Sequence, residues 1–279
     1  MPVPTFSILI CNYNHGCYLP QCLAGIRRQT FADFEVLITD DGSTDASQQI
    51  IADAAAKDPR IKPHYFAKNQ GAMAAVADIW GRATGSYIFG EGADDFMIDE
   101  RFLERAAAGL AAHPDAAGFF GVAGLFSAGK NTVVGKIGSA ARAGFVPPEE
   151  CYRDILRGRM FVPGSSSIWR RDCLEEIGGY DLTLGPQIDF LVNHALPSRH
   201  GAVFADVAVT CQRIHENASN FGSKGGTLWE STGRLAKVEQ RMREWARPYD
   251  GMEADWKLWR ARWTLDAIRT SGVHINPPR

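Results

Sequence analysis

The sequence of 279 residues lacks several features that would assign it to a special class of protein. Its net charge of −2 supplies no basic field, so we expect no nucleic-acid partner. No apolar run approaches the roughly 18 residues of a membrane span, and we expect no transmembrane segment. The N-terminus has no basic stretch followed by a long apolar one, so we expect no signal peptide.

Cysteine is also scarce, and none of the six residues forms a CxxC pair. They are Cys11, Cys17, Cys22, Cys151, Cys173 and Cys211. This spacing does not predict a disulfide framework or a zinc site, and it favours reduced cysteines that serve as packing residues. We therefore expect a cytoplasmic protein, and a location at the inner face of a membrane is compatible with the same pattern.

Apolar runs and helical segments alternate through the first half of the chain. The expected strands are residues 6–10, 34–38, 61–67, 87–89 and 117–126. The expected helices between them are residues 19–28, 45–57, 72–82 and 101–112. Regular alternation of this kind predicts an α/β fold: a mixed, mainly parallel sheet with helices on both faces.

The second half is less regular. From about residue 128 the chain is rich in Gly, Ala and Pro, and a helix is expected to begin near Ile188 before a strand-like run at 201–215. From residue 228 onward it is rich in Arg, Glu and Trp, which indicates about two helices. We predict one α/β domain over 1–222, with halves at 1–126 and 127–222, and a helical appendage over 223–279. Its tryptophans would pack internally, or contact a second copy of the chain or a membrane-borne partner.

Polar residues follow the expected strands at the point where each strand ends. They are Asn12, Asp40, Asp41, Asp94 and Asp95. In open parallel sheets, ligands bind beyond the carboxyl ends of the strands. Neighbouring carboxylates repel each other, and Mg²⁺ or Mn²⁺ would relieve that repulsion while leaving coordination positions for substrate phosphates. The pattern predicts a site for a nucleoside diphosphate, although the first pair can also bind base or ribose donors, or simply form a turn in which Ser43 or Thr44 caps the next helix.

These residues occur in an order that resembles a known family. The stretches "SILICNYNHGCYLPQCLAGIRRQTFADFEVLITDDGSTD", "NQG" and "GSYIFGEGADD" are together similar to family 2 glycosyltransferases of the GT-A (nucleotide-diphospho-sugar transferase) fold, over roughly residues 5–220. The resemblance implies inverting transfer of a sugar from a nucleotide-sugar donor, UDP-linked by expectation, to a glycan or lipid-linked acceptor. It also implies a divalent metal, Mn²⁺ or Mg²⁺, as cofactor.

The resemblance also implies roles for individual residues. Those expected at the nucleotide are Asn12, Tyr13, Asp40, Asp41, Asn69 and Ala93. Asp94 and His215, the latter in the late "RIH" segment, are the implied metal ligands. The sequence departs from the family at Gly92, which replaces the first Asp of the D-x-D motif. We expect that Glu91 cannot substitute for it, because side chains alternate along a strand and Glu91 would point to the other face.

The implied general base is Asp189, which follows "GGYD" at the start of the expected helix. The residue before it is Ile188, where the family usually has Glu, and an apolar setting would raise the pKa of the Asp189 carboxyl. The simpler alternative is that Asp189 only places negative charge at a helix N-terminus. We expect Asp181 to have a structural role. The residues implied at the acceptor or in support are Asp95, Ser165, Ser166 and Arg170.

Two other functions are compatible with the same residues. Acidic strand ends also occur in metal-dependent hydrolases that act on nucleotide diphosphates. Gly92 is compatible with a protein that binds a nucleotide sugar without turning it over. A Rossmann dehydrogenase is disfavoured, because no GxGxxG follows the first expected strand.

Overall fold

The computed structural model describes residues 3–179, 181, 183–184, 188–214, 228–245 and 252–270. The strands are β1 (Phe6–Asn12), β2 (Phe34–Asp40), β3 (Ile61–Tyr65), β4 (Tyr87–Gly92), β5 (Phe96–Met97), β6 (Gly118–Ser127), β7 (Thr132–Ile137), β8 (Gly144–Val146), β9 (Ser167–Arg170) and β10 (Ala202–Ile214). The helices are α1 (Leu19–Arg27), α2 (Ser47–Lys57), α3 (Ala72–Arg82), α4 (Phe102–Ala112), α5 (Pro148–Arg157), α6 (Arg171–Glu176), α7 (Ile188–His200), α8 (Leu228–Trp245) and α9 (Glu253–Thr270), with a 3₁₀ turn η1 (Gly164–Ser166).

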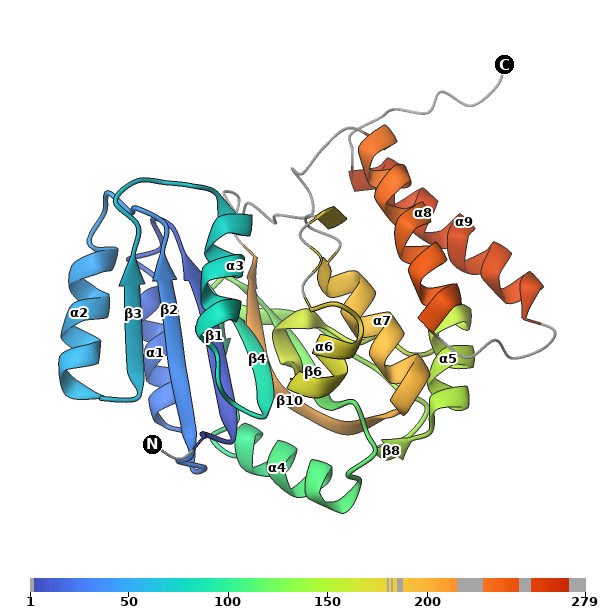
Figure 1. The fold of residues 1–279 in the computed structure, drawn as a ribbon, viewed down its shortest axis with the longest axis horizontal. Helices are drawn as coiled ribbons and strands as arrows, with labels where there is room; N and C mark the ends of the chain where they lie inside the picture. Colours follow the sequence, from blue (N-terminus) through green and yellow to red (C-terminus); the bar gives the residue numbers. More distant parts are fainter. Residues whose placement is uncertain are drawn as a thin grey trace.

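The strands form one mixed sheet (Figure 1). Eight of them follow the order β3-β2-β1-β4-β9-β6-β10-β5, while β7 pairs with β6 and β8 pairs with β10. Strands β3, β2, β1 and β4 are mutually parallel, and β6 is parallel to β10. Strand β9 lies antiparallel between β4 and β6, and joins the two parallel parts. The predicted mainly parallel α/β sheet is confirmed, with an antiparallel centre that local sequence did not indicate.

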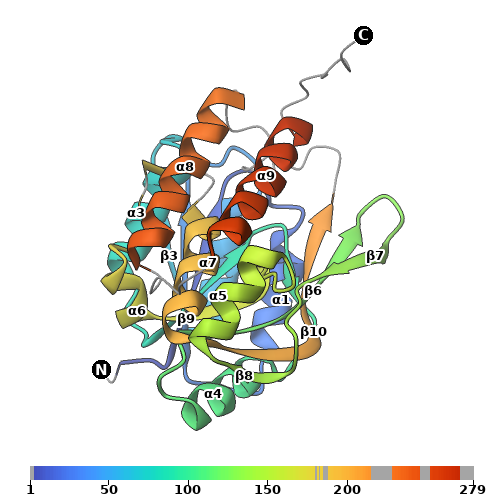
Figure 2. The same cartoon turned by 90° about the vertical axis from the view of Figure 1, so that its right-hand side faces the viewer.

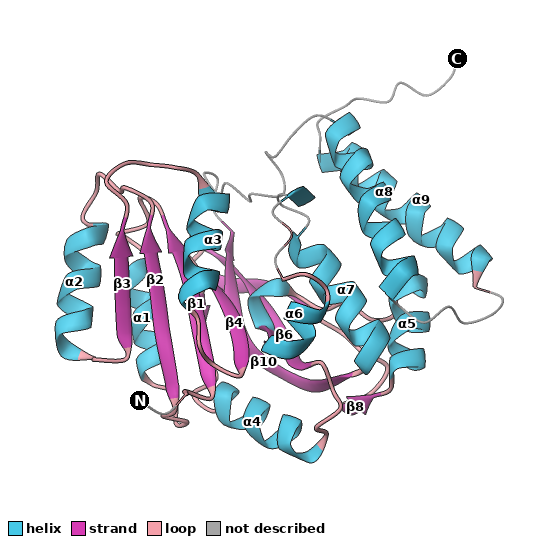
Figure 3. Ribbon diagram, in the orientation of Figure 1, coloured by secondary structure: helices cyan, strands magenta, loops and turns pink. Residues whose placement is uncertain are grey.

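Helices lie on both sides of the sheet (Figure 3), and each face of the sheet has its own core. Side chains alternate along β1, so that Leu9 belongs to one core while Ile8 and Ile10 belong to the other. Helices α1, α2 and α4 cover the second face, and α3, α5, α6 and α7 cover the first. All of the parallel strands therefore end at the same edge with helices on either side of it.

The two helices predicted after residue 223 are present as α8 and α9, which lie side by side over α5 and α7 (Figures 1 and 2). Trp256 and Trp259 are buried in the core of the first face, and Trp256 Nε1 donates to the Tyr152 hydroxyl at 2.8 Å. These tryptophans pack internally, as the simpler alternative expected. The domain limits at 1–222 and 223–279 stay predictions.

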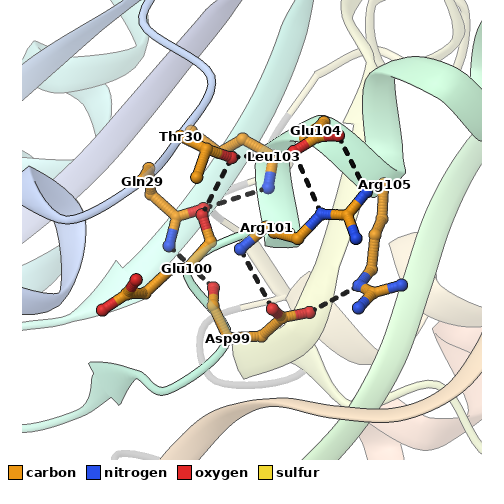
Figure 4. Close-up of polar contacts among 8 residues, drawn as sticks. All are labelled: Gln29, Thr30, Asp99, Glu100, Arg101, Leu103, Glu104 and Arg105. Carbon is orange, nitrogen blue, oxygen red and sulfur yellow. Dashed lines mark hydrogen bonds and ion pairs between the residues drawn. The ribbon is translucent and has the colours of Figure 1, made fainter.

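A polar network joins the end of α1 to the start of α4 (Figure 4). Gln29 Nε2 donates to the Asp99 carbonyl at 2.8 Å, and Gln29 Oε1 accepts from the Leu103 amide at 3.1 Å. The Thr30 amide donates to the Glu100 carbonyl at 2.8 Å, and its hydroxyl donates to Glu104. Gln29 and Thr30 of the "QTF" stretch therefore hold the segment that follows the Asp94–Asp95 pair. These contacts give the stretch a structural role.

The irregular segment after residue 128 contains elements that the sequence did not predict, namely β7, β8 and α5. Readable signals for α5 exist: Pro148 lies at its first position, Glu149 and Glu150 in its first turn, and Gly158 follows it with φ of 70°. The predicted capping of α2 by Ser43 or Thr44 is wrong, because neither caps it.

Among the described ranges, no helix combines the length and the hydropathy needed to cross a membrane.

Candidate functional site

A cavity of about 470 Å³ opens at the carboxyl edge of the sheet. Its apolar wall comes from β1, α3 and β9, and its polar wall from the end of β4, the η1 turn, α7 and β10. Polar residues along it are Glu91, Asp95, Ser165, Ser167, Asp189, Asn193 and Gln212. Three of these, Asp95, Ser165 and Asp189, were predicted as site residues, and the fold brings them together from segments nearly 100 residues apart.

Asp189 lies in the first turn of α7 and lines this cavity. A Cβ atom on Gly164 would lie 3.6 Å from Asp189 Oδ2, so the glycine leaves the η1 turn close to the carboxylate. The side chain is open to the cavity. The surrounding protein nevertheless desolvates the carboxyl and raises its pKa, with no hydrogen bond from the described residues to oppose the shift. The predicted shift of the Asp189 pKa therefore has a structural basis.

The residues predicted on the acceptor side do not all meet at the cavity. Ser165 lines it, and its Oγ is buried without a hydrogen-bond partner among the described residues. Ser166 Oγ instead donates to the Gly121 carbonyl at 2.8 Å, which ties η1 to β6. Arg170 is outside the cavity, where its guanidinium binds Asp172 and the Pro114 carbonyl. Those contacts tie Ser166 and Arg170 to the surrounding backbone and side chains, and their role at the acceptor or in support stays a prediction.

Asp40 is fully buried at the end of β2 and is already saturated with donors from the protein itself. Its Oδ2 accepts from Asn12 Nδ2 at 2.7 Å and from the Ser43 hydroxyl at 2.6 Å. Its Oδ1 accepts from the Ser43 amide and from Gln48 Nε2, both at 2.9 Å. Asn12 and Asp40 therefore tie the adjacent ends of β1 and β2 together, and neither lines the cavity.

Asp41 holds the loop that leads into α3. Its two oxygens accept from the amides of Gln70 and Gly71, at 2.6 and 2.9 Å. Asn69, just before them, is exposed, and so is the ring of Tyr13 on the loop after β1. These three predicted nucleotide residues lie on loops at the same edge of the sheet. Ala93 is buried.

Asp94 and Asp95 follow β4, and Arg213 of β10 anchors both. The Arg213 amide donates to Asp95 Oδ1 at 2.7 Å, and its Nε donates to the Asp94 carbonyl at 2.8 Å. Burial raises the pKa of Asp95 to about 7, and the nearby negative charge of Asp94 adds to the shift. A Cβ atom on Gly92 would lie only 2.8 Å from Asp95 Oδ2. The glycine in place of the first D-x-D aspartate therefore makes room for Asp95 to fold over the strand end.

Glu91 is buried at the end of β4, and neither of its carboxylate oxygens has a hydrogen-bond partner among the described residues. Burial raises the pKa of Glu91 well above its ordinary value, and the charges of Asp95 and Asp94 act in the same direction. Phe89, two residues earlier, belongs to the core under α1 and α4. Alternation along β4 places Glu91 on that same face, as predicted.

The described residues contain no cluster of three or more His, Cys, Asp or Glu side chains that could hold a metal by themselves. Mg²⁺ and Mn²⁺ need fewer, because one or two carboxylates suffice when water and substrate phosphates complete the shell. Asp94 at the strand end, beside Asp95, fits that demand. His215, the other predicted ligand, lies outside the described residues.

Several residues of the cavity wall were not predicted from the sequence. Trp80 of α3 and Trp169 of β9 form its apolar sides, and Gln212 of β10 faces them. Trp169 Nε1 donates to Asn193 Oδ1 at 3.1 Å, which fixes the indole against α7. None of these residues belongs to a motif, and only the packing of distant elements brings them together.

Comparison with known proteins gives the same assignment as the sequence motifs. The family model for glycosyl transferase family 2 matches residues 7–178. An uncharacterized glycosyltransferase of Haemophilus influenzae is 37% identical over 101 residues, 36% of this chain and 40% of that protein. A PGL/p-HBAD biosynthesis glycosyltransferase of Mycobacterium bovis is 35% identical over 113 residues, 40% of this chain and 44% of that protein. The chain thus matches less than half the length of these curated relatives.

Solved structures share the fold at low sequence identity. TarS 1–349 of S. aureus in complex with UDP-GlcNAc has a TM-score of 0.72 at 18% identity, covering 95% of this chain and 72% of that one. The mannosyltransferase PcManGT of Pyrobaculum calidifontis, in complex with GDP-Man and Mn²⁺, has a TM-score of 0.62 at 14% identity, covering 96% and 75%. These likenesses confirm the GT-A fold that the sequence predicted.

Proposed function

Because the chain belongs to glycosyltransferase family 2, we propose that it transfers a sugar from a UDP-linked donor to a hydroxyl of a glycan or lipid-linked acceptor, with inversion at the anomeric carbon. One observation carries the proposal: the Asp189 carboxylate lines the cavity without a hydrogen-bond partner among the described residues, beside the open η1 turn. Support for the donor class comes from the structural neighbours, which were solved with UDP-GlcNAc and GDP-Man.

In this mechanism the loops at the strand ends and the walls of the cavity have separate tasks. The exposed ring of Tyr13 and the loop held by Asp41 bind the nucleoside. Asp94 would hold the divalent cation, which would supply positive charge to the diphosphate leaving group. The apolar walls from Trp80 and Trp169 limit the access of water, which would otherwise compete with the acceptor.

Asp189 takes the proton of the acceptor hydroxyl as the oxygen attacks the anomeric carbon. A carboxylate with a raised pKa is a stronger base than an ordinary one. Attack occurs opposite the leaving diphosphate, and this geometry inverts the configuration of the transferred sugar. Ser165 lines the cavity in the same η1 turn as Gly164, beside Asp189, and in this proposal it helps to orient the acceptor.

Two alternatives make different predictions in the same assay. A metal-dependent hydrolase would need a cluster of ligands to activate water, and the described residues contain no group of three or more His, Cys, Asp or Glu side chains that could hold a metal. A binding protein without activity is favoured only by Gly92, which removes one expected carboxylate.

The test is incubation with several UDP- and GDP-sugars and Mn²⁺, following nucleotide release with and without glycoside and polyprenyl-phosphate acceptors. Slow release that an acceptor accelerates supports transfer. Fast release that acceptors do not change identifies a hydrolase, and binding without release identifies the inactive binding protein. Asp189→Asn in parallel separates catalysis from binding, because it should still bind the donor.

A further inference from the structure

We propose that His15 is a ligand of the divalent cation, together with Asp94, and that it supplies the coordination lost at Gly92. The inference rests on the proposed function and assigns a role to a residue of the loop after β1. Sequence reasoning gave His15 no role, because it belongs to no metal-binding spacing.

The first argument is distance. His15 Nδ1 lies 4.0 Å from Asp94 Oδ1, which is too far for a hydrogen bond. Metal–ligand bonds of nitrogen and oxygen donors to small divalent cations are about 2.0–2.2 Å long. Two such bonds span about 4.2 Å when they are collinear and less when the angle at the cation is smaller, so a separation of 4.0 Å lies within the reach of one cation bound by both atoms. Imidazole and carboxylate are both suitable ligands for first-row divalent metals.

The second argument is the state of the imidazole. His15 Nδ1 is shielded from solvent and has no hydrogen-bond partner among the described residues, although the ring itself is partly exposed. A ring nitrogen that water cannot reach normally has a protein partner. Here the nearest partner is Asp94, at a separation that a cation would fill. The edge-to-face contact with Tyr18, at 5.9 Å between ring centroids, orients the ring.

The third argument is that the loop is built to hold this position. Asn14 has a left-handed backbone with φ of 56°, and its Oδ1 accepts from the Thr44 amide at 2.8 Å. The backbone amide of Asn14 donates to the Ser43 hydroxyl at 2.9 Å. On the other side of His15, the Gly16 amide donates to Asp45 Oδ2 at 2.9 Å. Both neighbours of His15 are thus clamped to the loop after β2.

No other described side chain is better placed to supply the missing ligand. Gly92 has no side chain, and the buried oxygens of Glu91 are shielded from solvent on the opposite face of β4. Asp95 Oδ1 accepts a hydrogen bond from the Arg213 amide, so only Oδ2 of that carboxylate remains as a candidate metal ligand. His15 therefore completes a nitrogen and oxygen donor set at the strand end.

The test is electron paramagnetic resonance of Mn²⁺ bound to the full chain in the presence of UDP, with electron spin-echo modulation to detect a coordinated imidazole nitrogen. We expect the nitrogen signal in the wild type and its loss in His15→Ala, with Mn²⁺ affinity reduced at least about tenfold. His15→Gln is the second variant, because it keeps a polar side chain on the loop but has no imidazole. His64→Ala is the matched control, since His64 is exposed and bonds Asp78, away from the cavity. It should behave as the wild type.

Three results overturn the inference: retention of the nitrogen signal in both His15 variants, its loss only in His215→Ala, or no binding of Mn²⁺ by the wild type. Calorimetry with UDP alone, without metal, keeps the proposed function separate. Failure of the wild type to bind UDP contradicts the proposed function itself. Equal weakening of UDP binding by His15→Ala with and without metal shows a direct phosphate contact, and that also overturns the ligand role.

Discussion

At the scale of single residues, Asp189 has the two properties that a general base needs. Its carboxylate is open to the cavity, and no donor among the described residues occupies it. The alternative role, negative charge at a helix N-terminus, also fits its place in the first turn of α7. The two roles predict different turnover rates when Asp189 is replaced by a neutral side chain of the same shape.

Asp189→Asn keeps the shape of the side chain and removes its basicity. We expect turnover to fall by about 10² to 10⁴, the usual contribution of general-base catalysis, while donor affinity stays nearly unchanged. The measurements are steady-state kinetics and calorimetric titration with the donor. Asp181→Asn is the control, because the Asp181 carboxylate accepts from the Thr183 amide and hydroxyl and has a structural role. A dead Asp181→Asn beside an active Asp189→Asn would move the base to Asp181.

The pH profile provides a second prediction for the same residue. Only the ionised carboxylate accepts a proton, so activity should be lost as the pH falls through the pKa of Asp189. Burial raises this pKa above the ordinary 3.8, and the acid limb of the turnover–pH profile should therefore lie higher than for an ordinary aspartate. A limb at or below the ordinary value would contradict the assignment.

At the scale of elements, the network between α1 and α4 decides where the segment after Asp95 runs (Figure 4). The Gln29 amide group serves two backbone groups at once, the Asp99 carbonyl and the buried Leu103 amide. The first turn of α4 is thereby capped by a side chain from 74 residues earlier in the chain. These two hydrogen bonds fix the position of α4 relative to the segment that follows Asp94 and Asp95.

Gln29→Ala should therefore destabilise the fold by about 1–3 kcal/mol, because it leaves a buried amide without an acceptor. The measurement is urea unfolding at equilibrium. Gln49→Ala is the matched control, since the Gln49 amide bonds only Asp53 on the exposed face of α2. Equal unfolding midpoints for the two variants would show that the Gln29 bonds contribute nothing to stability.

At the scale of the whole molecule, Glu35 joins several strands through one buried carboxylate. It accepts from the Ser7 hydroxyl of β1 at 2.7 Å, from Lys62 Nζ of β3 at 2.7 Å and from the Thr84 amide before β4 at 2.8 Å. Burial by itself would raise the pKa of Glu35. The hydrogen bonds from Lys62, Ser7 and Thr84 outweigh burial and lower the pKa to about 2.

This shift predicts how stability depends on pH. A carboxyl whose pKa is lower in the folded than in the unfolded state stabilises the fold above the unfolded value of 4.5, and that stabilisation is lost as the pH falls through about 2. The full effect is on the order of 3 kcal/mol. Glu35→Gln should be less stable than the wild type at pH 7, and the difference should shrink as the pH falls from 4.5 to 2. A constant difference in urea unfolding across that range would exclude this linkage.

The sequence by itself determined the features that depend on local pattern. Alternating apolar runs specified the strands and their common carboxyl edge, because side-chain periodicity is a property of neighbouring residues. The same edge collected Asn12, Asp40 and Asp94, since parallel strands end together. The start of α7 at Ile188 and the absence of a ligand at Gly92 could also be read directly from the chain.

Only the tertiary structure decided how these residues are used. Asp40 has the sequence position of a ligand-binding carboxylate, but donors from β1, the following turn and α2 saturate it. His15 approaches Asp94, and Trp80 and Trp169 line the same cavity, although nothing in their spacing indicates either arrangement. The physical reason is the same in each case: hydrogen bonding, burial and approach are set by residues distant in the chain, and local periodicity contains no information about such pairs.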